Sequence, residues 1–191
     1  MIRAAGPADR AALDAFLVKH AESAMFLLGI LREYGVGVGD FPLSHPNATR
    51  FWWVGVGVIG VTQAGMLLPL LPEFAGFPGV RAQFGGASIA GAVGPMAQVR
   101  WLVSELGLVG RPVRVDKDEP GFRLDLGDLR VPVAEGAELI TPGAAERDLM
   151  LGWRQAYLME IMGEGGAEAA RKAKGDIDDY LARGSHRVLL R

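Results

Sequence analysis

The fold is decided between residues 51 and 72, which read FWWVGVGVIGVTQAGMLLPLLP. Only Thr62 and Gln63 are clearly polar here, and about 20 apolar residues are enough to span a bilayer as a helix. Glycine and proline interrupt the stretch, however, and valine alternates with glycine near its start, which is typical of buried strands joined by tight turns. We therefore favour strands over a membrane span. The predicted strands cover residues 51–57, 58–64 and 66–71.

The flanking residues supply helices before and after these strands. Apolar positions at helical spacing predict the helices, and Gly-Pro and Asp-Glu-Pro-Gly runs mark the turns between elements. We therefore predict an α+β fold in which a mixed, mostly antiparallel sheet is flanked by helices. The other predicted elements are helices at residues 10–20, 23–34 and 95–106 and strands at residues 2–5, 88–93, 111–117 and 122–126.

Composition excludes several kinds of site. The chain has no cysteine, which rules out disulfides and cysteine-bound metals and fits a reducing cytoplasm. His20, His45 and His186 share no ligand spacing, so we expect no metal. A net charge of -2 without a block of like charges argues against a nucleic-acid partner. Half of the 191 residues are hydrophobic, which is enough to bury the core of one domain, or of one domain and part of a second.

A short motif occurs twice in the chain. Residues 6–10 read Gly-x-Ala-Asp-Arg and residues 143–147 read Gly-x-Ala-Glu-Arg, at an offset of 137 residues (143 minus 6). Both copies lead from a short strand into an amphipathic helix, and a period of domain size fits a duplication. The second copy continues with predicted helices at residues 148–162 and 167–182 and a last strand at residues 186–190.

Three segments carry a resemblance to a known family. Residues 21–27 (AESAMFL) look like the start of the second helix of an N-terminal module, and residues 94–99 (GPMAQV) look like the start of its fourth helix. Residues 153–160 (WRQAYLME) look like the first helix of a C-terminal module. With the element order, they resemble tandem-module bacterial proteins of the GCN5-related N-acetyltransferase (GNAT) superfamily. The resemblance implies a GNAT-like module at residues 1–133 and the opening half of a second, strand, two helices and strand, at residues 134–191.

The resemblance also implies an activity, acetyl transfer from acetyl-CoA as co-substrate to a primary amine, on a small molecule or a peptide N-terminus. A general base would deprotonate the amine, and backbone N–H groups would polarise the thioester carbonyl. On this interpretation the second module stops at Arg191, before its phosphate-binding loop, so we expect weak or no activity from this chain alone. The alternative is a non-catalytic GNAT-like module with an assembly or regulatory role. Its last strand would then pair with the first module or with another subunit, as in a homo-oligomer.

The cofactor loop of the first module departs from the family motif. That motif is Arg/Gln-x-x-Gly-x-Gly/Ala, where x is any residue. Such a loop holds pyrophosphate on successive backbone N–H groups. Here Gly76 and Gly79 remain, but the Arg or Gln is absent, Pro78 lacks an N–H group and Glu73 adds negative charge. The resemblance assigns cofactor binding to Gly76, Phe77 and Gly79, and a plain turn is the alternative.

Trp153, Tyr157 and Glu160 share one face of a predicted helix, at spacings of four and three. By resemblance this helix borders the acceptor site, where Glu160 would orient the amine and the two aromatic side chains would wall the pocket. A core stripe with one solvated carboxylate is the alternative. The family's catalytic tyrosine normally follows the phosphate loop, and Tyr34, Tyr157 and Tyr180 all lie elsewhere in the sequence, so we assign no catalytic residue.

Overall fold

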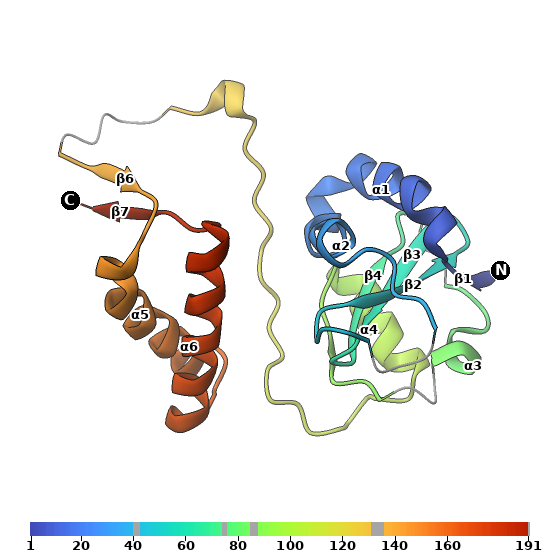
Figure 1. Ribbon diagram of the computed structural model, residues 1–191. Helices are drawn as coiled ribbons and strands as arrows, with labels where there is room; N and C mark the ends of the chain where they lie inside the picture. Colours follow the sequence, from blue (N-terminus) through green and yellow to red (C-terminus); the bar gives the residue numbers. More distant parts are fainter. Residues whose placement is uncertain (40–42, 74–75, 85–87, 131–135, 191) are drawn as a thin grey trace. The chain divides into compact units, whose positions relative to one another are not determined.

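The computed structural model describes residues 1–39, 43–73, 76–84, 88–130 and 136–190. The chain divides into two compact units, Met1–Arg111 (unit 1) and Pro112–Arg191 (unit 2), each of which is described by itself (Figure 1). The module boundary predicted after residue 133 lies outside the described residues. Over the described ranges, no helix is both long enough and apolar enough to cross a membrane.

Unit 1 is built on a five-stranded sheet in the order β1-β2-β3-β4-β5. β1 to β4 pair antiparallel and β5 runs parallel to β4, so the predicted α+β class with a mixed, mostly antiparallel sheet is confirmed. The stretch that decides the fold supplies β3, β4 and most of β2, with bounds within three residues of those predicted. The strands are β1 (Ile2–Ala4), β2 (Thr49–Val54), β3 (Gly57–Thr62), β4 (Met66–Leu70) and β5 (Gly91–Ala92).

Helices cover both faces of this sheet, because successive side chains of a strand point to opposite faces. The helices of unit 1 are α1 (Arg10–Lys19), α2 (Ala21–Tyr34), α3 (Val80–Phe84) and α4 (Met96–Glu105). The first buried cluster joins α1 and α2 to one face and includes Leu13, Leu17, Leu27, Leu31, Phe51, Val58, Leu68 and Leu70. The second joins α3 and α4 to the other face and includes Trp52, Val54, Ile59, Val61, Leu67, Val80, Phe84 and Leu102.

The central strand β3 allows α2 to approach closely at Gly60. A Cβ atom at this position would lie 2.6 Å from Cδ2 of Leu27 and 2.9 Å from Cγ2 of Thr49. Glycine therefore lets Leu27 reach the sheet and become buried, which stabilises the fold by about 1.5–3 kcal/mol for a side chain of this size.

The prediction of two strands at residues 111–117 and 122–126 is wrong. The structure has neither helix nor strand from residue 111 to residue 125, and every residue from 109 to 130 is exposed. A strand is stable only when its edge is paired and one of its faces is buried. The alternating sequence pattern of this segment fits a strand, but in the structure it has no sheet or helix to cover its apolar side chains.

Unit 2 is a helical hairpin with one short pair of strands. Its elements are β6 (Glu138–Ile140), α5 (Arg147–Glu160), α6 (Gly166–Arg183) and β7 (Val188–Leu190). The helices predicted at residues 148–162 and 167–182 are confirmed. α5 packs against α6 through two small buried clusters. One includes Met150, Ile177 and Val188, and the other includes Leu158, Ala169 and Ala173. The last strand, expected to pair with the first module or with another subunit, pairs antiparallel with β6 instead.

The repeated motif has the same local conformation in both units. In unit 1 the backbone N–H of Gly6 donates to the Asp9 carboxylate at 2.9 Å, and in unit 2 that of Gly143 donates to the Glu146 carboxylate at 2.8 Å. A short 3-10 helix and then α1 or α5 follow, again 137 residues apart. The preceding strand pairs antiparallel with the strand after the helix pair in both units. The sequence repeat thus corresponds to a repeated strand, two helices and strand.

Candidate functional site

The loop assigned to the cofactor lies between β4 and α3. Gly76 and Gly79 have φ angles of +79° and +91°, which residues with a side chain rarely adopt. Phe77 is half-buried in the second cluster, with its ring 6.4 Å from that of Trp101 in an edge-on contact. The loop is therefore anchored to the core through Phe77, while Phe74 and Ala75 lie outside the described residues.

The surroundings of this loop offer little to an anion. α3, which follows it, has only five residues and therefore a weak dipole. Pro78 has no N–H group to donate, and Glu73 exposes a carboxylate just before the loop. The cation on α3, Arg81, donates from Nε to the backbone oxygen of Glu105 at 2.7 Å, at the C-terminal end of α4. The geometry suits a packed turn better than a pyrophosphate site.

The residues assigned to the amine acceptor lie together on α5. Trp153 and Tyr157 are 56% and 45% exposed, which contradicts the core stripe of the alternative, whereas the exposed Glu160 fits both interpretations. The Arg154 guanidinium lies 5.2 Å from the ring centre of Tyr157 and also pairs with Asp176 of α6 at 2.7 Å. The face therefore combines two exposed aromatic rings with a carboxylate, beside an arginine fixed by α6.

The other two tyrosines are held in ring stacks at the ends of helices. Tyr34, the last residue of α2, stacks on His45 at 4.6 Å, and Tyr180 of α6 stacks on His186 at 3.7 Å. Burial raises the pKa of the Tyr180 phenol. Each phenol ring is therefore packed against a histidine ring.

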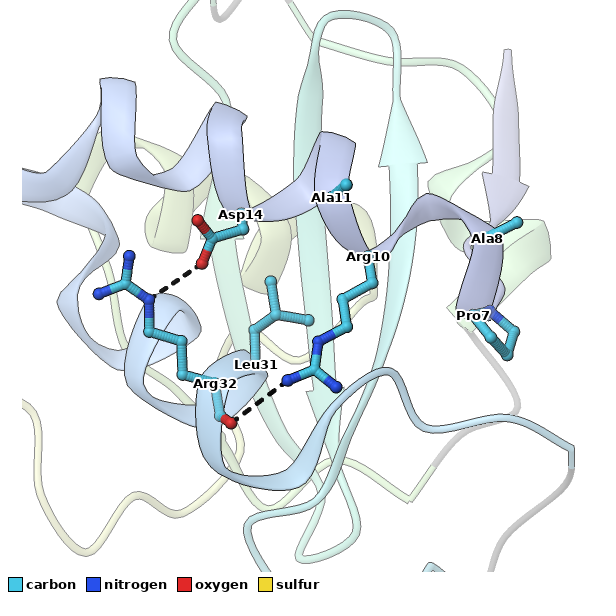
Figure 2. Close-up of a pocket in the computed structure, with 7 residues that line it drawn as sticks. All are labelled: Pro7, Ala8, Arg10, Ala11, Asp14, Leu31 and Arg32. Atoms are coloured by element: carbon cyan, nitrogen blue, oxygen red, sulfur yellow. Dashed lines mark hydrogen bonds and ion pairs between the residues drawn. The ribbon is translucent and has the colours of Figure 1, made fainter.

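A pocket that the sequence did not predict lies between the start of α1 and the end of α2 (Figure 2). It is an open pocket of about 400 Å³, and its lining consists of Pro7, Ala8, Arg10, Ala11, Asp14, Leu31 and Arg32. Arg32 donates from Nε to Asp14 at 2.9 Å, and this hydrogen bond lowers the pKa of the Asp14 carboxyl. Arg10 donates from Nη2 to the backbone oxygen of Arg32 at 3.5 Å.

The pocket depends on residues from two helices that only tertiary packing brings together. In Figure 2 the Arg32 side chain turns toward Asp14, while the Arg10 guanidinium lies over the Arg32 carbonyl with Leu31 between the two arginines. The repeated motif that contains Arg10 is a sequence signal that could have indicated this position. Two arginines against one carboxylate leave the lining with an excess positive charge that suits an anion.

In the described parts of either unit, no three His, Asp or Glu side chains lie together as a group that could hold a metal ion. Comparison of the sequence with protein-family models gives no match. Comparisons with curated proteins and with solved structures likewise give no significant match.

Proposed function

We propose that this chain is a GNAT-type N-acetyltransferase polypeptide, which takes part in acetyl transfer from acetyl-CoA to a primary amine. The amine nitrogen would attack the thioester carbonyl carbon, the C–S bond would break, and the coenzyme A thiolate would take up a proton. The observation that carries the proposal is the order of elements in unit 1, from β1 through two helices and three antiparallel strands to α3, β5 and α4.

The repeat in unit 2 supports the same proposal, because it has the strand, two helices and strand that would open a second module. The exposed face of Trp153, Tyr157 and Glu160 supports an acceptor role for α5. Aromatic rings can bind an ammonium group through its positive charge, and a carboxylate can orient the amine by a hydrogen bond. The departure from the expected order is the segment at residues 111–125, which forms no strand.

The second candidate is a non-catalytic GNAT-like protein with an assembly or regulatory role. The packing of Phe77 against Trp101 favours it, since the loop that would hold acetyl-CoA is itself tied to the core. The proline in this loop and the five residues of α3 favour it for the same reason, because both reduce the number of aligned N–H donors.

Calorimetric titration of the 191-residue chain with acetyl-CoA separates the two candidates. If the loop binds the cofactor, we expect micromolar affinity for the wild type and loss of binding in Gly79→Val, because a β-branched residue at a φ of +91° would distort the loop. Gly110→Val is the matched control: Gly110 has a φ of +81° and a Cβ there would meet no atom within 4 Å. It adds the same kind of backbone strain away from the loop.

If acetyl-CoA binds, thiol release with a panel of primary amines tests the acceptor face. Trp153→Ala should then raise KM for the amine, while Met159→Ala, which removes another exposed side chain of α5, should not. Absence of acetyl-CoA binding up to millimolar concentration would overturn the transferase proposal for this chain and leave the non-catalytic candidate.

A further inference from the structure

Arg10 and Arg147 occupy the same position in the two repeats. Each is the first residue of its helix, α1 or α5, and each directly follows the acidic residue that accepts the Gly6 or Gly143 amide. Each also forms a hydrogen bond with the second helix of its pair, Arg10 with Arg32 of α2 and Arg147 with Asp178 of α6. In both helices the contacted residue directly follows a buried aliphatic side chain. The two arginines can therefore be compared directly, although they belong to units described separately.

In unit 2 this arginine is neutralised by a carboxylate. Arg147 donates from Nε and Nη2 to Oδ1 of Asp178 at 3.2 and 2.6 Å, and Asp178 follows the buried Ile177 on α6. The hydrogen bond from Arg147 is the main reason why the pKa of the Asp178 carboxyl is lowered. Unit 2 thus shows the partner that an arginine at this position takes.

In unit 1 the corresponding carboxylate is missing. The residue after the buried Leu31 is Arg32, and its side chain turns away to Asp14. Within the described residues, Arg10 makes one hydrogen bond, at 3.5 Å to a backbone oxygen, which is at the limit of hydrogen-bond length. An arginine fork that can bind a carboxylate through two donors is therefore directed into an open pocket whose own carboxylate, Asp14, is already hydrogen-bonded to Arg32.

We propose that the pocket between α1 and α2 binds the carboxylate of a small aliphatic acid, with Arg10 holding it as Arg147 holds Asp178. The excess of one positive charge in the lining suits a monoanion. The exposed apolar side chains of Pro7 and Ala11 would contact a short hydrocarbon chain, and the volume of about 400 Å³ accommodates a ligand of this size. This site is independent of acetyl transfer, because none of its residues belongs to the cofactor loop or to the α5 face.

The test is an NMR titration of the full chain with butyrate, followed on the backbone amides of residues 8–14 and 31–35 and on the Arg10 Nε–H. Because an exposed charge pair is weak in water, we expect saturable shifts with a millimolar Kd. Butyramide, which has the same chain but no charge, should give no saturable shift. Equal shifts from butyramide, or from chloride at the same concentration, would overturn the proposal.

Three variants sharpen the test. Arg10→Gln should abolish the shifts, whereas Arg147→Gln, which removes an arginine already paired with Asp178, should titrate like the wild type. Arg32→Asp supplies a carboxylate after Leu31, as unit 2 has after Ile177, and should weaken butyrate binding at least roughly tenfold by occupying Arg10. Unchanged amide dispersion shows that each variant is folded. A wild-type titration curve in both Arg10→Gln and Arg32→Asp would refute the site.

Discussion

Leu71 and Gln98 are joined by two hydrogen bonds that pair the backbone just beyond the end of β4. The Leu71 N–H donates to Oε1 of Gln98 at 2.9 Å, and Nε2 of Gln98 donates to the Leu71 carbonyl at 3.0 Å, both in a buried environment. The Gln98 side chain of α4 thus supplies the backbone of Leu71 with the two hydrogen bonds that a neighbouring strand would otherwise supply.

The first prediction concerns this pair. Gln98→Met keeps the side-chain length but leaves a buried N–H and a buried carbonyl without partners, so we expect a loss of about 2–4 kcal/mol in the free energy of unfolding. Urea denaturation followed by circular dichroism measures it. Gln83→Met, at an exposed position of α3, is the control and should stay within about 0.5 kcal/mol of the wild type. Equal stabilities of the two variants would show that the hydrogen bonds to Leu71 contribute nothing.

The second prediction compares two glycines. Gly60→Ala should destabilise unit 1 by about 1–3 kcal/mol, because its Cβ would overlap Leu27 and Thr49. Gly29→Ala should instead stabilise it by about 0.5–1 kcal/mol, since Gly29 lies within α2 and a Cβ there meets no atom within 4 Å. Thermal unfolding of both variants checks the opposite signs. A stabilising Gly60→Ala would mean that α2 does not lie as close to β3 as described.

The third prediction concerns acid stability. Hydrogen bonds from Arg3, and then from the Gly6 amide, hold the pKa of the Asp9 carboxyl well below its usual range. Because the pKa is lowered in the folded state, the contribution is complete above the unfolded-state pKa of about 4 and is lost as pH falls through the folded value. Stability of unit 1 should therefore decline below about pH 4, and Asp9→Asn should flatten that decline.

Unfolding midpoints measured between acidic and neutral pH test this, with Asp128→Asn as a control that keeps the wild-type profile. An Asp9→Asn profile as steep as that of the wild type would contradict the prediction. NMR titration of the Asp9 carboxyl carbon reads the same pKa directly.

The fourth prediction compares Phe16 and Trp153, which are 137 residues apart at equivalent positions of α1 and α5. Phe16 is half-buried and its ring lies 5.6 Å from that of Trp53, so Phe16→Ala should cost about 1–3 kcal/mol. Trp153 is 56% exposed, and Trp153→Ala should cost less than about 0.5 kcal/mol. Chemical denaturation measures both. A large loss in Trp153→Ala would mean that the ring is buried in solution, as a core residue or under a partner.

Local sequence patterns predict the elements that bury one face. The strands from residue 51 to residue 72 and the helices α1, α2, α5 and α6 follow from apolar spacing and turn residues. The same reasoning fails at residues 111–126, because an alternating pattern says nothing about whether a neighbouring edge exists to pair with it.

The pocket and the Gln98 contact lie beyond what a local pattern can predict. Arg32 and Asp14 are separated by 18 residues, and Gln98 and Leu71 by 27, so each contact exists only after the helices have packed. A glutamine in an amphipathic helix looks like a surface residue until the end of β4 is known to lie beside it. The environment of Phe77 depends on packing in the same way. Helical spacing alone, in contrast, places Trp153, Tyr157 and Glu160 on one face of α5, but it does not tell whether that face is buried or exposed.

The position of each strand in its sheet has a consequence for how the chain opens. β3 is paired on both sides and all six of its residues are buried, so its amide protons should exchange with solvent only through global unfolding of unit 1. β7 is paired with β6 alone over three residues, and Leu189 is 63% exposed. The β7 amides should exchange by local fraying, because the free energy of opening is far lower there than that of global unfolding. Deuterium uptake should therefore be graded within one polypeptide, slowest in β3 and fastest among the strands in β7.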